Sequence, residues 1–190
     1  METNILIDDL PTDYNGYLIN YTFKSGILIS ECLNDNSFKD EREKVYTALR
    51  ILFGRGIPPI EIALDGLKWF LSGGMTTKNK DDHKNSKNIF SFVKDRNMIF
   101  SAFMMKYNIN LNKSNMHFFE FLSLFNDLDK TAFKRVVDLR TMTPKEIKSY
   151  SREQRQKIYK LKEEFALEDN NQQQEEKTKF DLLMEKLNDK

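Results

Sequence analysis

The strongest helical signal in this 190-residue chain is FFEFLSLFNDL, at residues 118–128. Its large apolar side chains recur at i, i+3, i+4, i+7 and i+10, which is one face of an α-helix: Phe118, Phe121, Leu122, Phe125 and Leu128. Glu120, Ser123 and Asp127 leave only a narrow polar edge. A helix that is apolar around most of its circumference usually lies at the centre of a fold. We therefore expect this helix to be the centre of the core.

Phenylalanine is concentrated in this helix and in the segment before it. Eight of the fifteen phenylalanines lie between residues 90 and 128. Burying each of them contributes about 1.5–3 kcal/mol before the loss of conformational entropy is subtracted. The segment is therefore able to hold neighbouring helices together, and the residues by themselves indicate a soluble helical protein.

The rest of the chain predicts a mainly all-α fold: a compact domain of about seven helices with a small N-terminal β-hairpin and a C-terminal helical tail. The length suits one domain. Periodicity and capping residues place the other helices. We expect a helix at about 22–33 with Phe23, Ile27 and Leu33 inward, a second that Ser37 caps and Gly54 ends, and a third that begins at Pro59 and ends at Gly73-Gly74. We then expect a helix at about 95–107, one after Asp129, a helical turn at Thr143-Pro144, and a last helix that Ser151 caps.

Composition divides the chain into three regions. We expect residues 1–167 to form the helical core domain, residues 168–178 a polar low-complexity linker, and residues 179–190 an amphipathic tail helix. The apolar residues of the tail fall at i, i+3, i+4 and i+7: Phe180, Leu183, Met184 and Leu187. A helix of roughly ten residues is marginal alone in water, so we expect the tail to fold against something.

Local signals inside the core region predict a turn, a close contact and a loop. Asn15-Gly16 suits the positive φ angles of a type I′ hairpin turn. Gly66 lies inside a predicted helix, where it costs about 1 kcal/mol relative to alanine, so we expect another element to pack closely there. Residues 75–88 have no hydrophobic period, which predicts a solvated loop.

Charge and cysteine content exclude several classes. The formal net charge is +1, so no global field favours nucleic acid or anionic lipid. Locally, residues 130–162 carry 11 Lys/Arg and 3 Asp/Glu (+8), whereas residues 163–190 carry 4 and 9 (−5). A lone cysteine, Cys32, excludes an internal disulfide and a multi-cysteine zinc site. No apolar run approaches the roughly 18 residues that span a bilayer, so we expect no membrane partner.

The chain offers little material for catalysis. His83 lies in the charged loop, where a solvated histidine is the usual state. His117 has Glu120 at i+3, a spacing that occurs in some metal sites, but its apolar neighbours favour a place at the edge of the core. No Gly-rich phosphate loop and no nucleophile elbow is present. We therefore expect no enzyme, no metal and no cofactor.

The basic segment at 130–162 offers a second possibility. Its lysines and arginines are numerous enough for several phosphate contacts. Such charges more often solvate the outer faces of helices, and no groove-reading motif accompanies them. Binding to nucleic acid is therefore the less favoured interpretation.

A set of residues in a shared order resembles a known phage family over about residues 12–167. These residues are Tyr17-Leu18-Ile19, Phe23-Lys24, Trp69-Phe70 before Gly73-Gly74, Phe90, Phe92, Asp95, Ile99, Ala102-Phe103, Tyr107-Asn108-Ile109, Leu111, Met116-His117-Phe118-Phe119, Phe121, Leu128, Arg140, and Arg155 to Leu167 with Tyr159, Lys160, Lys162 and Phe165. The chain is similar here to the "gene product fifteen" family of siphophages and prophages of Gram-positive bacteria. It differs in having Phe118-Phe119 where a Trp pair is common.

The resemblance implies a tail assembly chaperone in the host bacterial cytoplasm, absent from the mature virion. Such proteins are thought to coat the tape-measure protein, a very long and largely apolar helical polypeptide. We accordingly expect self-association and assign partner binding to Trp69, Phe70, Phe118, Phe119, Phe180, Leu183, Met184 and Leu187. The alternatives are a structural virion component, such as a head-tail connector or tail-completion protein, and a phage nucleic-acid-binding regulator.

Overall fold

The computed structural model describes residues 3–75 and 89–167 of the chain. The described residues form two compact units: the first is 3–75 with 91–135, and the second is 89–90 with 136–167. The predicted tail helix, its linker and almost all of the predicted loop at 75–88 lie outside the described residues. The extent predicted for the core domain, 1–167, stays a prediction.

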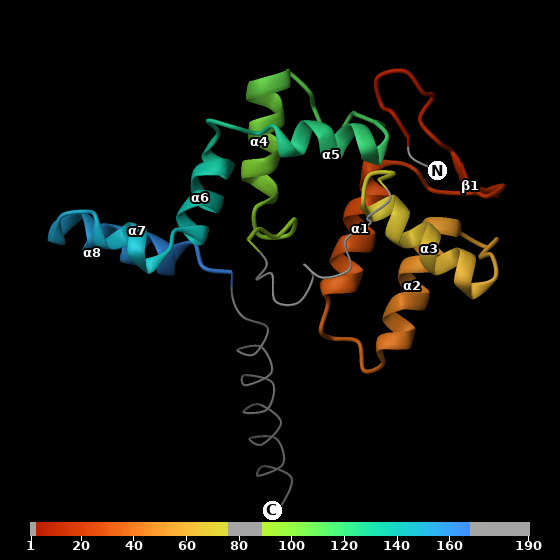
Figure 1. The fold of residues 1–190 in the computed structure, drawn as a ribbon, viewed down its shortest axis with the longest axis horizontal. Coiled ribbons are helices and arrows are strands. Elements are labelled where there is room, and N and C mark those ends of the chain that lie inside the picture. The colour runs from red at the N-terminus through yellow and green to blue at the C-terminus, as the bar shows by residue number, and fades with distance from the viewer. Residues whose placement is uncertain (1–2, 76–88, 168–190) are drawn as a thin grey trace, which may run out of the picture. The chain divides into compact units, whose positions relative to one another are not determined.

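The described elements are helical apart from one two-stranded sheet, which confirms the predicted fold class (Figure 1). In chain order they are β1 (Asp13–Tyr14), β2 (Tyr17–Leu18), α1 (Phe23–Asn34), α2 (Glu41–Phe53), α3 (Ile60–Leu71), α4 (Arg96–Tyr107), α5 (Phe118–Asn126), α6 (Ala132–Thr141), α7 (Pro144–Lys148) and α8 (Arg152–Glu164). Residues 3–75 and 89–167 thus hold eight helices where about seven were predicted, because the turn at Thr143-Pro144 counts as a helix, α7.

The hairpin forms where the sequence predicts it. Strands β1 and β2 pair antiparallel, with Asp13 opposite Leu18 and Tyr14 opposite Tyr17. The two turn residues, Asn15 and Gly16, have φ angles of 51° and 81°. Asparagine and glycine tolerate this left-handed conformation best, so the Asn-Gly pair determines the turn.

Phe121 is the central side chain of the first unit. Its ring is fully buried and stacks on Phe103 of α4 at a centroid distance of 5.2 Å with an interplanar angle of 5°. It also stacks on Phe23 of α1 at 5.2 Å and on Phe125 of α5 at 5.6 Å. Helices α1, α4 and α5 therefore share one aromatic core, as the phenylalanine pattern predicts.

Two glycines allow helices to approach unusually closely. A Cβ atom on Gly26 of α1 would overlap the ring of Phe118. A Cβ atom on Gly66 of α3 would lie 2.8 Å from Tyr14 and 2.9 Å from Phe53. Real Cβ atoms essentially never come so close to a neighbouring atom, which confirms the close packing predicted at Gly66.

The starts of α1 and α5 are joined by a short antiparallel bridge between Thr22 and His117. The Phe118 amide donates to the Tyr21 carbonyl at 2.8 Å, and the Phe23 amide donates to the Met116 carbonyl at 3.1 Å. Thr22 and His117 are also the N-caps of the two helices. One bridge therefore fixes where both helices begin.

Four details differ from the sequence predictions. Asp40, not Ser37, caps α2, because its carboxylate accepts from the Arg42 amide. Pro59 is the N-cap of α3 and not its first helical residue. On α1 the fully buried isoleucine is Ile29, whereas Ile27 is half-buried. Helix α5 ends at Asn126, so Leu128 is buried from the turn that follows it.

In the second unit, polar contacts attach α8 to the end of α6. The ammonium group of Lys162 donates to three carbonyls at the C-terminus of α6, those of Leu139, Arg140 and Met142, at 2.8–2.9 Å. The Arg140 side chain donates in return to the Phe165 carbonyl at 2.7 Å. A cation is favourable at the negative end of a helix, so these contacts hold the α6–α8 connection in place.

Candidate partner-binding surface

Three of the predicted partner-binding aromatics lie in the core of the first unit. Phe70, Phe118 and Phe119 are 0, 2 and 3% exposed, and Trp69 is half-buried. They contact a partner only if α3 or α5 moves. Their assignment stays a prediction, as does that of the four tail residues, which lie outside the described part of the chain.

Those core aromatics form a layer between α3 and α5. Phe70 stacks on Phe118 at a centroid distance of 4.9 Å. Trp69 meets Phe119 edge to face at 5.3 Å and lies 4.9 Å from Tyr14 of the hairpin. Aromatic pairs at these distances contribute about 0.5–1.5 kcal/mol beyond the area they bury, so the layer has a clear structural role.

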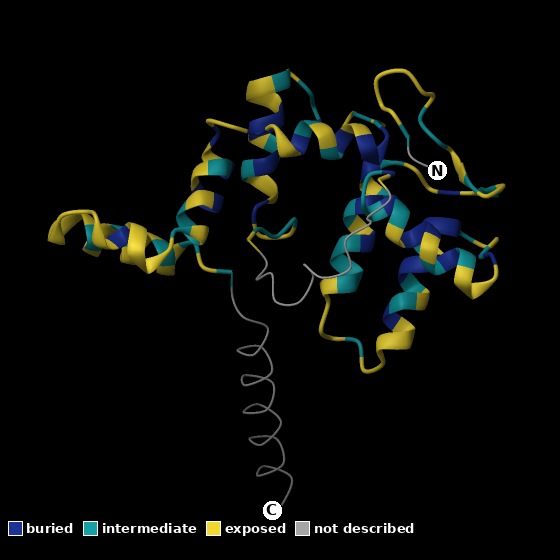
Figure 2. Cartoon of the chain, in the orientation of Figure 1, coloured by how far each residue is buried: buried dark blue, intermediate teal, exposed yellow. Residues whose placement is uncertain are grey.

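Helix α4 presents a solvent face of a different kind. Its inner side is buried through Ile99, Ala102 and Phe103. The opposite side, which we call the α4 outer face, consists of Asn97, Phe100, Ser101, Met104 and Met105. Met105 is 77% exposed and Met104 is 37% exposed, whereas Phe100 is half-buried. Along α4, buried, intermediate and exposed residues are all present (Figure 2).

The α4 outer face carries no charged side chain, although 31% of the residues in the chain are charged. The charges of α4 lie elsewhere on the helix. Arg96, at its first turn, donates to the Val93 carbonyl at 3.1 Å. Lys106, at its last turn, pairs with the Asp127 carboxylate at 2.8 Å. Covering this face with apolar groups would therefore desolvate no charge; desolvating one would be costly.

Three pKa values are shifted at the end of α4. The Lys106 ammonium lowers the pKa of Asp127 through its hydrogen bond and its charge, and Asp127 raises the pKa of Lys106 in return. Desolvation is the main cause that raises the pKa of Tyr107, whose hydroxyl donates to the Leu124 carbonyl at 2.8 Å. The group therefore keeps a fixed charge near neutral pH and joins α4 to the end of α5.

His117 has the structural place that its apolar neighbours predicted. Its ring is buried and stacks on Tyr21 at 5.4 Å. Its Nδ1 accepts from the Phe119 amide at 3.0 Å, and its Nε2 lies 2.9 Å from the Pro11 carbonyl. Burial lowers the pKa of this imidazole. Among the residues the structure describes, no group of three or more His, Cys, Asp or Glu side chains is placed to hold a metal ion.

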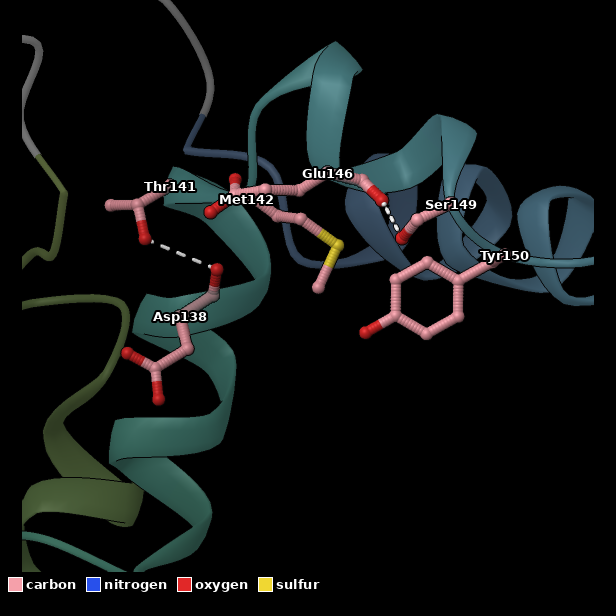
Figure 3. A pocket seen from close by; sticks show the side chains of 6 residues that line it. All are labelled: Asp138, Thr141, Met142, Glu146, Ser149 and Tyr150. Carbon is pink, nitrogen blue, oxygen red and sulfur yellow. Dashed lines mark hydrogen bonds between the residues drawn. The ribbon is translucent and has the colours of Figure 1, made fainter.

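The second unit contains an open hollow of about 410 Å³ at the junction of α6 and α7 (Figure 3). Its lining residues are Asp138, Thr141, Met142, Glu146, Ser149 and Tyr150. The Glu146 carboxylate accepts from the amide and hydroxyl of Thr143, at 2.6 and 2.7 Å, and these bonds lower its pKa. Ser149 and Thr141 donate to backbone carbonyls. Since these groups complete the helix ends, we assign the hollow no binding role.

The lysines and arginines of the basic segment at 130–162 have two kinds of environment. Lys162 and Arg140 bind carbonyls within the second unit. Lys145, Lys148 and Lys160 are exposed, as expected for charges that solvate outer helix faces. None of the helices that the structure describes is long and apolar enough to cross a bilayer.

The sequence gives a weaker signal for the α4 outer face than for the aromatic residues, which were predicted to bind a partner instead. The spacing of Ile99 and Phe103 predicts a helix here and its buried side, but not the use of its other side. A signal was nonetheless present: Met104 and Met105 lie on the side of the helix away from Ile99, with no charge among them. A helix that is apolar on two sides has a second surface to cover.

The chain matches the model of a known protein family. Residues 6–167 match a family model described as "Bacteriophage Gp15 protein". No curated protein and no solved structure matches the chain. The matched range includes both the aromatic core and the residues that attach α8 to α6.

Proposed function

Because this chain belongs to the bacteriophage Gp15 protein family, we propose that it is a phage tail assembly chaperone that binds the tape-measure protein and keeps it soluble during tail morphogenesis. The surface that we assign to this task is the α4 outer face. The observation that carries the proposal is the adjacent exposed pair Met104 and Met105 on an uncharged helix face.

The chemistry of this face suits a long apolar helix. Methionine is unbranched and has a polarisable sulfur, so a methionine surface adapts to apolar partners of varied sequence. An amphipathic or apolar helix binds such a surface through side chains at i, i+3, i+4 and i+7. The tape-measure protein, as the family resemblance describes it, offers many such positions in one chain. Several copies of the chaperone then coat it through repeated contacts of moderate affinity.

The rest of the proposal follows from this role. The protein acts in the cytoplasm of the host bacterium, performs no catalytic step and uses no cofactor. Copies of it associate with each other along the tape-measure protein. It leaves before the tail is complete, so it is absent from the mature virion, and it binds neither nucleic acid nor membrane.

Co-expression with the tape-measure protein of the same phage tests the proposal. We expect the tape-measure protein to be recovered in the soluble fraction only when the wild-type chain is present. Equal recovery without the chain contradicts a chaperone role.

Mass spectrometry of purified virions distinguishes a chaperone from a structural virion component. A connector or tail-completion protein remains in the particle, whereas a chaperone is absent.

A further inference from the structure

Helix α8 leaves its apolar side chains incompletely covered. Ile158, Leu161 and Phe165 recur at i, i+3 and i+7 along α8 and its C-cap, yet none of the thirteen residues of α8 is buried. Leu161 is 41% exposed, and the neighbouring Tyr159 is 52% exposed. An amphipathic helix in a folded unit normally buries its apolar stripe. We call this set the α8 stripe: Ile158, Leu161 and Phe165.

The described part of the second unit buries few apolar side chains. The exposed α8 stripe is therefore a large part of the apolar surface that this unit has available for a core. Among its described residues, 89–90 and 136–167, the buried apolar side chains are Val136, Val137 and Ile147. Chains shorter than about 40 residues rarely fold on so small a core without further burial. The attachment of α8 through Lys162 and Arg140 is polar, so it does not supply that burial.

We propose that the α8 stripe is a docking surface and that residues 180–187 of the same chain occupy it. These residues carry a matching stripe: Phe180, Leu183, Met184 and Leu187. Twelve residues, 168–179, separate Leu167 from Phe180. Fully extended they reach about 40 Å, whereas the thirteen residues of α8 are about 20 Å long. The chain is therefore long enough to turn back and run along α8.

Charge favours the same pairing. Exposed Lys157 lies one helical turn before Leu161, on the side of α8 that carries the stripe, and within the segment 130–162 whose net charge is +8. The segment that follows, 163–190, has a net charge of −5. Exposed pairs contribute little individually, so the charges orient the docked segment while the apolar side chains hold it.

Tethering favours the same chain over a second copy. A short flexible linker gives its end an effective concentration in the millimolar range, far above a micromolar concentration of other copies. The docked segment completes the core of the second unit and covers an apolar stripe that otherwise favours association. This inference does not depend on the proposed function, because it concerns α8 and not the α4 outer face.

Disulfide trapping tests the inference. In a Cys32→Ala background, Leu161→Cys is combined with Leu183→Cys, and the control combines Gln156→Cys with Leu183→Cys. Gln156 is exposed and lies about 140° around the helix from Leu161. At low protein concentration we expect the first pair to form a disulfide within one chain about tenfold faster than the control pair. Equal rates overturn the inference, and so does a disulfide-linked dimer as the main product.

Hydrogen exchange provides a second measurement that needs no new cysteine. The Leu183→Asp substitution puts a charge into the docked stripe, so the α8 amides should exchange about tenfold faster than in the wild type. The amides of α1 to α5 should keep their rates, which shows that the first unit is still folded. Unchanged exchange in α8 overturns the inference.

Discussion

The Nε2 atom of His117 lies 2.9 Å from the backbone carbonyl oxygen of Pro11, although 106 positions separate the two residues in the sequence. On the other side of the ring, Nδ1 accepts from the Phe119 amide. Only the neutral imidazole with its proton on Nε2 makes both bonds, because a proton on Nδ1 would face the donating amide. The histidine thus caps α5 and attaches the N-terminal segment to it in one protonation state.

This arrangement predicts a pH dependence of stability. Burial lowers the pKa of His117 below its ordinary value of 6.5, against the opposing effects of the Pro11 carbonyl and the Glu120 charge. The unfolded chain therefore binds a proton at a higher pH than the folded chain. The stabilisation is complete above 6.5 and is lost as the pH falls below it. Urea unfolding at about pH 7.5 and about pH 5.5 measures this loss.

The matched variant is His117→Asn, since asparagine caps a helix well but does not titrate. We expect the free energy of unfolding to fall less between the two pH values in this variant than in the wild type. An identical fall in both proteins would show that His117 does not control the transition.

Gly26 predicts a steric effect in the core. Alanine there would place its Cβ atom in the ring of Phe118 and force α1 away from α5. We expect Gly26→Ala to lower the free energy of unfolding by about 1–3 kcal/mol, as overpacking does elsewhere. The control is Gly56→Ala, where the nearest atom to the added Cβ is 4.0 Å away. If both variants unfold at the same urea concentration, α1 and α5 do not pack as closely at Gly26 as described above.

Lys162 predicts a local effect in the second unit. The Lys162→Met substitution keeps the aliphatic stem but removes three charge-assisted bonds to the end of α6. We expect a loss of about 1–3 kcal/mol, because hydrogen bonds to charged groups are stronger than neutral ones. Hydrogen exchange should become faster in α6, α7 and α8. Lys160→Met, at an exposed position on the same helix, should leave those rates unchanged.

The ion pair at the end of α4 predicts a measurable titration. Lys106 lowers the pKa of the Asp127 carboxyl below its ordinary value of 3.8. The contribution of this pair to stability is therefore present above that value and is lost as the pH falls through the lowered pKa. An NMR titration of Asp127 should show an upward shift of its pKa in the Lys106→Met variant. An unshifted titration would mean that the contact does not persist in solution.

Local chemistry explains why much of the fold could be predicted. The Asn15-Gly16 turn, the Gly54 stop and the Ser151 cap depend on neighbouring residues alone, and all three form as predicted. The helix at 118–128 was predicted from its period, which also does not depend on the rest of the chain. The N-cap of α2 could not be chosen in this way, because Ser37 and Asp40 are both good caps; in the structure the Asp40 carboxylate accepts from the Arg42 amide.

The candidate surface was less predictable for a physical reason. Aromatic residues serve equally well in a core and in an interface, so Phe70, Phe118 and Phe119 suggested partner binding although they are buried. Which face of α4 is solvated depends on the position of α5, whose Phe121 covers Phe103. That contact joins residues on two different helices, and a single amino-acid sequence does not show which helices pack together.

The affinity of the purified protein for a soluble fragment of the tape-measure protein tests the central claim most directly. The measurement compares the wild type with Met105→Glu, on the α4 outer face, and with Met75→Glu, at a methionine outside it that is 62% exposed. Both are surface substitutions, so each should change stability by no more than about 0.5 kcal/mol. We expect Met105→Glu to weaken binding at least about tenfold, which is 1.4 kcal/mol, while Met75→Glu binds like the wild type. The claim is contradicted if the wild type does not bind the fragment, or if Met105→Glu binds it as tightly as Met75→Glu.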